Sequence, residues 1–173
     1  MGTRGIIARV DDERGWAGNY HHWDSYPSGL GKTLWELYHG CFKHDLKQML
    51  QMLIDEHLAG WSTINGADFD LEPGWYERES FHIEKGHRPV CHCHGERHDI
   101  GRLIFPEDDF GAEWAYVFDE AKNTMIILMA VDSEGVYAMG FFGSNPERTG
   151  WREVGVVDLE EAEPDWALLE GGE

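Results

Sequence analysis

The stretch WAYVFDEAKNTMIILMAV, residues 114–131, decides the fold class because it carries the clearest β-pattern in the chain. Residues 114–118 and 124–131 are rich in aromatic and β-branched side chains, which favour strands. The polar segment between them predicts a turn. A second turn at residues 133–135 leads to another apolar run over 136–142, which we interpret as a third strand. The three runs predict an antiparallel meander toward the C-terminus.

Toward the N-terminus, the sequence predicts a β-hairpin followed by helices. Residues 3–10 and 16–23 indicate two strands joined by a polar turn. Apolar residues recur at helical spacing over residues 30–58. We expect this segment to divide near Gly40 or Asp45 into two helices.

Length and composition predict one folded domain with an acidic end. The chain has 173 residues, of which 42% are hydrophobic, and this is enough to fill one core. We therefore predict a single α+β domain over residues 1–157, with an N-terminal β-hairpin, central helices and a C-terminal antiparallel meander. Residues 158–173 contain seven acidic residues and no basic one, and we interpret them as an acidic C-terminal tail.

The charge balance excludes several classes of partner. Lys and Arg number 14 against 33 Asp and Glu, so the formal net charge is −19. Direct binding to nucleic acid and binding to anionic membranes both need a basic face, so neither is expected. Acidic inhibitors use such charge to speed association, which makes a basic protein the predicted partner. The alternative is that the charge only keeps the protein soluble.

The cysteine count and the N-terminal residues bear on the cellular compartment. Three cysteines are an odd and low number for a disulfide framework. The first residues lack the basic and apolar segments of a signal peptide. No window approaches the roughly 18 consecutive apolar residues of a membrane-spanning helix. We therefore expect a cytoplasmic protein.

Metal-ligand residues are densest in residues 82–98. Seven histidines and cysteines fall there: His82, His87, Cys91, His92, Cys93, His94 and His98. Zinc prefers thiolate and imidazole ligands in tetrahedral geometry. In an extended segment Cys91 and Cys93 point to the same side. We predict that these cysteines bind zinc with His98 as a third ligand and with His87, or the distant Cys41, as the fourth.

Alternatives to a structural zinc site remain open for this segment. The Cys-x-Cys spacing is a weaker signal than Cys-x-x-Cys, because the shorter link strains a tetrahedral chelate. The segment could instead hold a catalytic or regulatory metal, or form an exposed hairpin without metal. It could also contain a redox-active pair, Cys91 and Cys93.

A second group of polar side chains, His21, His22 and Asp24, lies in the segment NYHHWDSY, residues 19–26. On a strand His22 and Asp24 share one face, where a histidine and an aspartate can form an acid–base pair. The three residues are therefore candidate catalytic residues. The alternative is a structural corner between strand and helix, in which Asp24 and Ser25 cap backbone amides and the aromatic residues fill the core.

Three motifs resemble a family of uncharacterised proteins from bacteriophages and bacteria. They are MGTRG at residues 1–5, NYHHWDSYPSGLG at residues 19–31 and EWAYVFD at residues 113–119. The family pattern has Asn where this chain has His21, and Ile where it has Phe118. The resemblance implies a bacterial or phage-infected cell as the setting, but no mechanism, because the family has no established activity.

The N-terminal region is also distantly similar to the N-terminal nucleophile amidohydrolases. Those enzymes use the side chain of residue 2 as the nucleophile and its own α-amine as the base. Here the position holds Gly2, which has no side chain. The similarity therefore implies an inactive copy.

These observations favour a non-enzymatic function: an acidic interaction or inhibitor-type protein with a structural zinc site. The alternative is a hydrolase. It would be metal-dependent at Cys91, Cys93 and His98, or of the N-terminal nucleophile type and inactive as written. A structural phage component is a third hypothesis.

Overall fold

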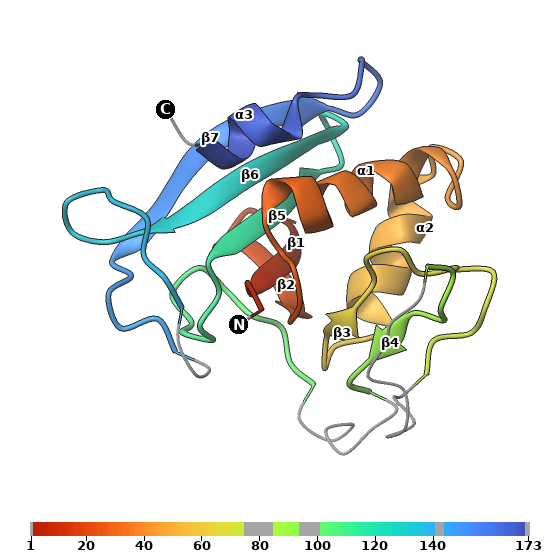
Figure 1. The fold of residues 1–173 in the computed structure, drawn as a ribbon, viewed down its shortest axis with the longest axis horizontal. Helices are drawn as coiled ribbons and strands as arrows, with labels where there is room; N and C mark the ends of the chain where they lie inside the picture. Colours follow the sequence, from red (N-terminus) through yellow and green to blue (C-terminus); the bar gives the residue numbers. More distant parts are fainter. Residues whose placement is uncertain (1, 75–84, 94–100, 141–143, 172–173) are drawn as a thin grey trace.

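The fold is a mixed β-sheet with short helices, seen in a computed structural model that describes residues 2–74, 85–93, 101–140 and 144–171. Within these residues seven strands form one sheet in the spatial order β4-β3-β2-β1-β5-β6-β7 (Figure 1). The strands are β1 (Gly5–Asp11), β2 (Gly15–His21), β3 (Trp61–Thr63), β4 (Val90–Cys91), β5 (Trp114–Asp119), β6 (Thr124–Val131) and β7 (Gly150–Asp158). The predicted α+β class is confirmed.

The helical elements are short and follow the N-terminal hairpin. They are η1 (Pro27–Gly31), α1 (Lys32–His39), α2 (Leu46–Leu50), η2 (Gln51–Asp55) and, after β7, α3 (Trp166–Gly171). Both η1 and η2 are single π-helical segments continuous with an α-helix. The break between α1 and α2 contains Lys43 and His44, both with positive φ, which an α-helix does not tolerate. Among the described helices none is long and apolar enough to cross a membrane.

Strand β1 lies in the middle of the sheet. It pairs antiparallel with β2, from Gly5 opposite His21 to Asp11 opposite Gly15. Its other edge pairs in parallel with β5, a strand that begins more than a hundred residues later. The hairpin therefore becomes the centre of the sheet only when β5 docks on it.

The C-terminal meander has a different third strand from the one predicted. Strand β7 pairs antiparallel with β6 along its length, so the third strand is Gly150–Asp158 and the prediction of residues 136–142 was wrong. In that segment Tyr137 makes one isolated bridge to Val131, and residues 141–143 lie outside the described part. Gly135, with φ of +79°, turns the chain away after β6.

Side chains of successive strand residues enter two separate cores, as the two-residue period of a strand requires. Ile7 and Tyr116 face the larger core, which the helices cover, whereas Ile6 and Ala115 face a smaller one. The smaller core is covered by residues 104–112 rather than by a helix. Both faces of the central strands are therefore buried.

The acidic C-terminal segment packs on the body of the protein. Leu159 and Trp166 are buried in the larger core. The side chain of Glu170, on α3, accepts hydrogen bonds from the hydroxyl and the backbone amide of Ser28 at the start of η1. Helix α3 thus closes over η1 and the nearby face of the sheet (Figure 1).

Candidate metal centre

A tight turn after η2 places His57 beside the outer strands of the sheet. The backbone amide of Gly60 donates to the carbonyl oxygen of His57 at 2.8 Å. Gly60 has φ of +81°, and a Cβ there would collide with the carbonyl oxygen of Tyr20. Only glycine therefore fits between the helix end and β2, and this close approach brings His57 to the edge where β3 begins.

Strand pairing brings the two cysteines to the same place. Trp61 on β3 is paired with Cys91 on β4, and the amide of His92 donates to the carbonyl oxygen of Gly60 at 2.9 Å. Cys91 is fully buried, and Cys93 follows two residues later with partial exposure. The sheet edge thus presents both sulfurs next to the turn that carries His57.

His57, Cys91 and Cys93 form a group with metal-binding geometry. One ring nitrogen of His57 and the two sulfurs all lie within 4.8 Å of one another. Zinc binds thiolate sulfur at about 2.3 Å and imidazole nitrogen at about 2.0 Å, so its ligands must stand this close together. His57 is only 6% exposed, so water reaches the group chiefly on the side of Cys93.

Neighbouring side chains hold the backbone of this centre in place. The buried side-chain amide of Asn19 donates to the carbonyl oxygens of Leu53 at 2.6 Å and of His57 at 2.8 Å. The indole N–H of Trp61 also donates to the carbonyl oxygen of Leu53, at 2.8 Å. The Trp61 ring packs against the His57 imidazole with their centroids 4.5 Å apart. The histidine is therefore supported from two strands.

The structure brings together two of the predicted ligands and adds one that the sequence did not indicate. His98 lies outside the described residues. His87 lies apart from the group, with its ring nitrogens at 2.5 Å from the carbonyl oxygen of Arg88 and 3.1 Å from that of Asn65. His57 stands 34 positions before Cys91. No local spacing links them, so only the fold reveals the pairing.

The remaining cysteine, Cys41, lies away from this group on an exposed surface. It lines a surface cavity together with Asp68 and Asp70. Partial burial and these two carboxylates raise the pKa of its thiol. A thiol that resists deprotonation is a poor metal ligand, because zinc binds the thiolate.

His21, a candidate catalytic residue, has both ring nitrogens committed to structural hydrogen bonds. Nε2 accepts from the backbone amide of Ile64 at 3.2 Å, so Nδ1 carries the proton and faces the hydroxyl of Ser25 at 2.8 Å. Burial, followed by the charges of His22 and His92, lowers the pKa of His21 to about 3. His21 is therefore neutral and fully buried, and its hydrogen bonds connect β2 to the segment after β3.

His22 and Asp24 take separate structural positions. Nδ1 of His22 lies 2.8 Å from the hydroxyl of Tyr20. Asp24 has φ of +52°, and its carbonyl oxygen accepts from the backbone amide of Leu30 and the side chain of Asn65. These bonds to the backbone carbonyl form a corner that leads from β2 into η1.

At the N-terminus, Gly2 lies against the indole ring of Trp23, where a Cβ would collide with the ring. The position of the nucleophile in N-terminal nucleophile enzymes is thus closely packed here.

No family model, curated protein or solved structure matches this chain. The resemblance to phage and bacterial proteins therefore stays a prediction.

Proposed function

We propose that this chain is a zinc-binding interaction protein in which His57, Cys91 and Cys93 hold the ion in a structural role. The observation that carries the proposal is the convergence of one imidazole and two sulfurs within 4.8 Å. Two thiolates and an imidazole form a donor set that binds zinc in preference to hard cations such as magnesium, which favour oxygen ligands.

A structural role is supported by the weakness of the sheet at this edge. Strand β3 has three residues and β4 has two, with an irregular register between them. Few ladder hydrogen bonds therefore hold β4 in place. A metal ion shared by His57 and the two cysteines would link β4 to the end of η2, and its binding free energy would stabilise this edge.

The fourth coordination position decides between the structural role and the hydrolase alternative. A fourth protein ligand closes a zinc site, whereas a bound water leaves it open for catalysis. The sequence predicts His98 as a third ligand beside the two cysteines, and with His57 in the group we propose that it takes the fourth position. Replacing zinc with Co²⁺ and comparing the visible spectrum of the wild type with that of His98→Gln tests it, because loss of a nitrogen ligand changes the ligand-field bands.

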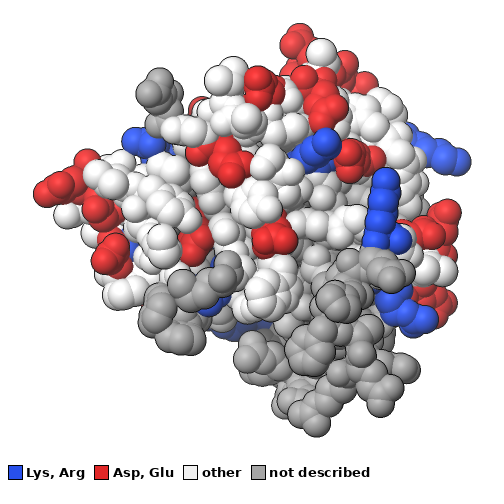
Figure 2. All heavy atoms as spheres, in the orientation of Figure 1, with Lys and Arg blue, Asp and Glu red and all other residues white. Residues whose placement is uncertain are grey.

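Partner binding through acidic charge is the second part of the proposal. Figure 2 shows acidic side chains at several separate places on one face, with basic side chains beside some of them. The net charge of −19 supports attraction over a distance rather than one focused patch. A specific partner should have a basic surface, and its association rate should fall steeply as salt concentration rises.

Elemental mass spectrometry on protein purified without chelator tests the metal centre. We expect about one zinc per chain and its loss in the variants Cys91→Ser, Cys93→Ser and His57→Gln. Cys41→Ser is the matched control and should keep the metal. Metal-free wild-type protein, or unchanged zinc in Cys91→Ser, would overturn the proposal.

A further inference from the structure

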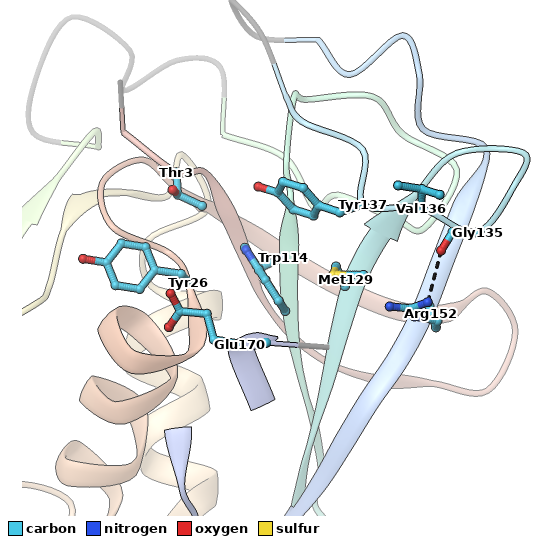
Figure 3. A pocket seen from close by; sticks show the side chains of 10 residues that line it. Thr3, Tyr26, Trp114, Met129, Gly135, Val136, Tyr137, Arg152 and Glu170 are labelled. Atoms are coloured by element: carbon cyan, nitrogen blue, oxygen red, sulfur yellow. Dashed lines mark hydrogen bonds between the residues drawn. The ribbon is translucent and has the colours of Figure 1, made fainter. Parts of the chain in front are cut away.

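A cavity of about 570 Å³ lies beside β5, β6 and β7, away from the β3–β4 edge that carries the metal centre. Its walls come from four parts of the chain. They are the segment before β1, the start of η1, the turn after β6 and the last turn of α3 (Figure 3). A volume of this size suits a small molecule.

The floor of the cavity is a row of three side chains across neighbouring strands. Trp114 is paired with Met129, and Met129 with Arg152, so the three lie side by side on one face of the sheet. Trp114 and Met129 are 4% and 5% exposed. The Tyr137 ring lies next to Trp114 with centroids 6.1 Å apart and extends the aromatic surface. The floor is therefore formed largely by packed, apolar side chains.

The two ends of the cavity carry opposite charges. Figure 3 shows Glu170 between Tyr26 and Trp114 at one end, and Arg152 with Gly135 at the other. The Glu170 carboxylate is held by the hydroxyl of Ser28 at 2.5 Å. The guanidinium of Arg152 donates to the carbonyl oxygen of Gly135 at 3.1 Å. Glu170 is thus a fixed anion with aromatic rings on both sides.

The end that holds Glu170 is electrostatically negative. Burial, then Asp24 and Glu170, raise the pKa of Tyr26, and the same carboxylate adds to the effect of burial on Tyr116. Both phenols therefore stay neutral. On the other wall the hydroxyl of Tyr137 donates its proton to the carboxylate of Glu113 at 2.8 Å.

We propose that this cavity binds a small organic cation, an alkyl or aryl ammonium compound, with the ammonium group at Glu170. The carboxylate would accept hydrogen bonds from the N–H groups of the ammonium or, where it has none, neutralise its charge. Tyr26 and Trp114 would supply cation–π attraction. The apolar body of the ligand would lie over Met129 and against Val136, which is 57% exposed at the rim. The negative field of the whole protein favours the same sign of ligand.

Three probes with the same ring test the sign of the ligand: 2-phenylethylammonium, 2-phenylethanol and 3-phenylpropanoate. Each is titrated into ¹⁵N-labelled full-length protein, and the shifts of the Trp114 indole and the Gly135 and Val136 amides are followed by NMR. We expect the ammonium probe to bind most tightly, the alcohol about fivefold more weakly, and the carboxylate most weakly.

Substitutions then assign the charge to a residue. Glu170→Gln should weaken binding of the ammonium probe about fivefold. Glu161→Gln makes an equal change of charge on the same C-terminal segment and should leave this affinity unchanged. Val136→Lys, which adds a positive charge at a rim position that is 57% exposed, should weaken binding of the ammonium probe too. The proposal would be overturned if no probe shifted the NMR signals of the cavity, or if Glu170→Gln bound the ammonium probe as tightly as the wild type. It would also be overturned if the carboxylate probe bound most tightly and lost that binding in Arg152→Gln.

Discussion

Asn19 donates a hydrogen bond from its side-chain amide to the carbonyl oxygen of His57, across 2.8 Å. Because Asn19 belongs to β2 and is fully buried, this bond fixes the backbone that carries the imidazole to a central part of the sheet. The second N–H of the same amide bonds to Leu53, so one side chain orders the whole end of η2.

Replacing Asn19 should damage both stability and metal binding. Asn19→Ala leaves two buried carbonyl oxygens without this donor, which should lower the free energy of unfolding by about 2 kcal/mol. The apparent zinc affinity should fall as well, because His57 loses its support. The partly exposed Asn65 also donates to two carbonyl oxygens, so Asn65→Ala is the control. Urea denaturation and zinc titration would contradict the role if both variants behaved alike.

His21 should make folding sensitive to acid. Its pKa is about 3 in the folded protein against 6.5 ordinarily, so below pH 6.5 the unfolded chain binds a proton that the folded protein does not. The contribution of this residue to the free energy of unfolding should fall by about 1.4 kcal/mol per pH unit from pH 6.5 toward pH 3. His21→Asn should remove that slope. Parallel stability curves for the metal-free wild type and variant, from pH 7 to pH 4, would refute this.

Glu160 should anchor the C-terminal segment in its ionised form. Hydrogen bonds from Tyr38, then from His44 and Asn123, lower the pKa of this carboxyl below 4.5. The stabilisation is therefore present above pH 4.5 and is lost as pH falls through the lower, folded-state value. Glu160→Gln should have a lower melting temperature at pH 7, and the difference from the wild type should narrow in acid. Glu161→Gln is the control, and an equal effect there would contradict the anchor.

Trp166 should hold α3 on the body of the protein. It is 6% exposed, and its ring lies close to Gly31, where an added Cβ would be 3.1 Å from it. Trp166→Ala should cost about 3 kcal/mol in urea denaturation and speed proteolysis after β7. Leu168, on the same helix, is 75% exposed, so Leu168→Ala should change stability by less than about 0.5 kcal/mol. Equal protease resistance in all three proteins would show that Trp166 is no anchor.

The sequence predicted the elements whose pattern is local. Strands β5 and β6 are recognisable because β-branched and aromatic residues fill both of their faces. The break between α1 and α2 lies at the predicted residues, because Gly40 follows the end of α1 and Asp45 caps the start of α2. Strand β7 was missed because its residues are partly exposed and include Arg152, Glu153 and two glycines. A bulge opposite Ile127 and Leu128 also interrupts its alternation.

The candidate centre was predicted in part for the same reason. Cys91 and Cys93 share one side of an extended segment, and that follows from their spacing alone. His57 reaches them only because Gly60 lets the chain pass close to Tyr20 and β3 then pairs with β4. Contacts of this kind depend on how distant segments meet, which a one-dimensional pattern does not encode.

The position of β1 between β2 and β5 sets the order of events during synthesis on the ribosome. The hairpin emerges early, but one edge of β1 stays open until residues 114–119 have left the exit tunnel. For most of translation the nascent chain therefore carries an unpaired strand edge of the kind that promotes aggregation. Completion of the sheet is a late step, and chaperones that shield such edges have the longest time to act on β1.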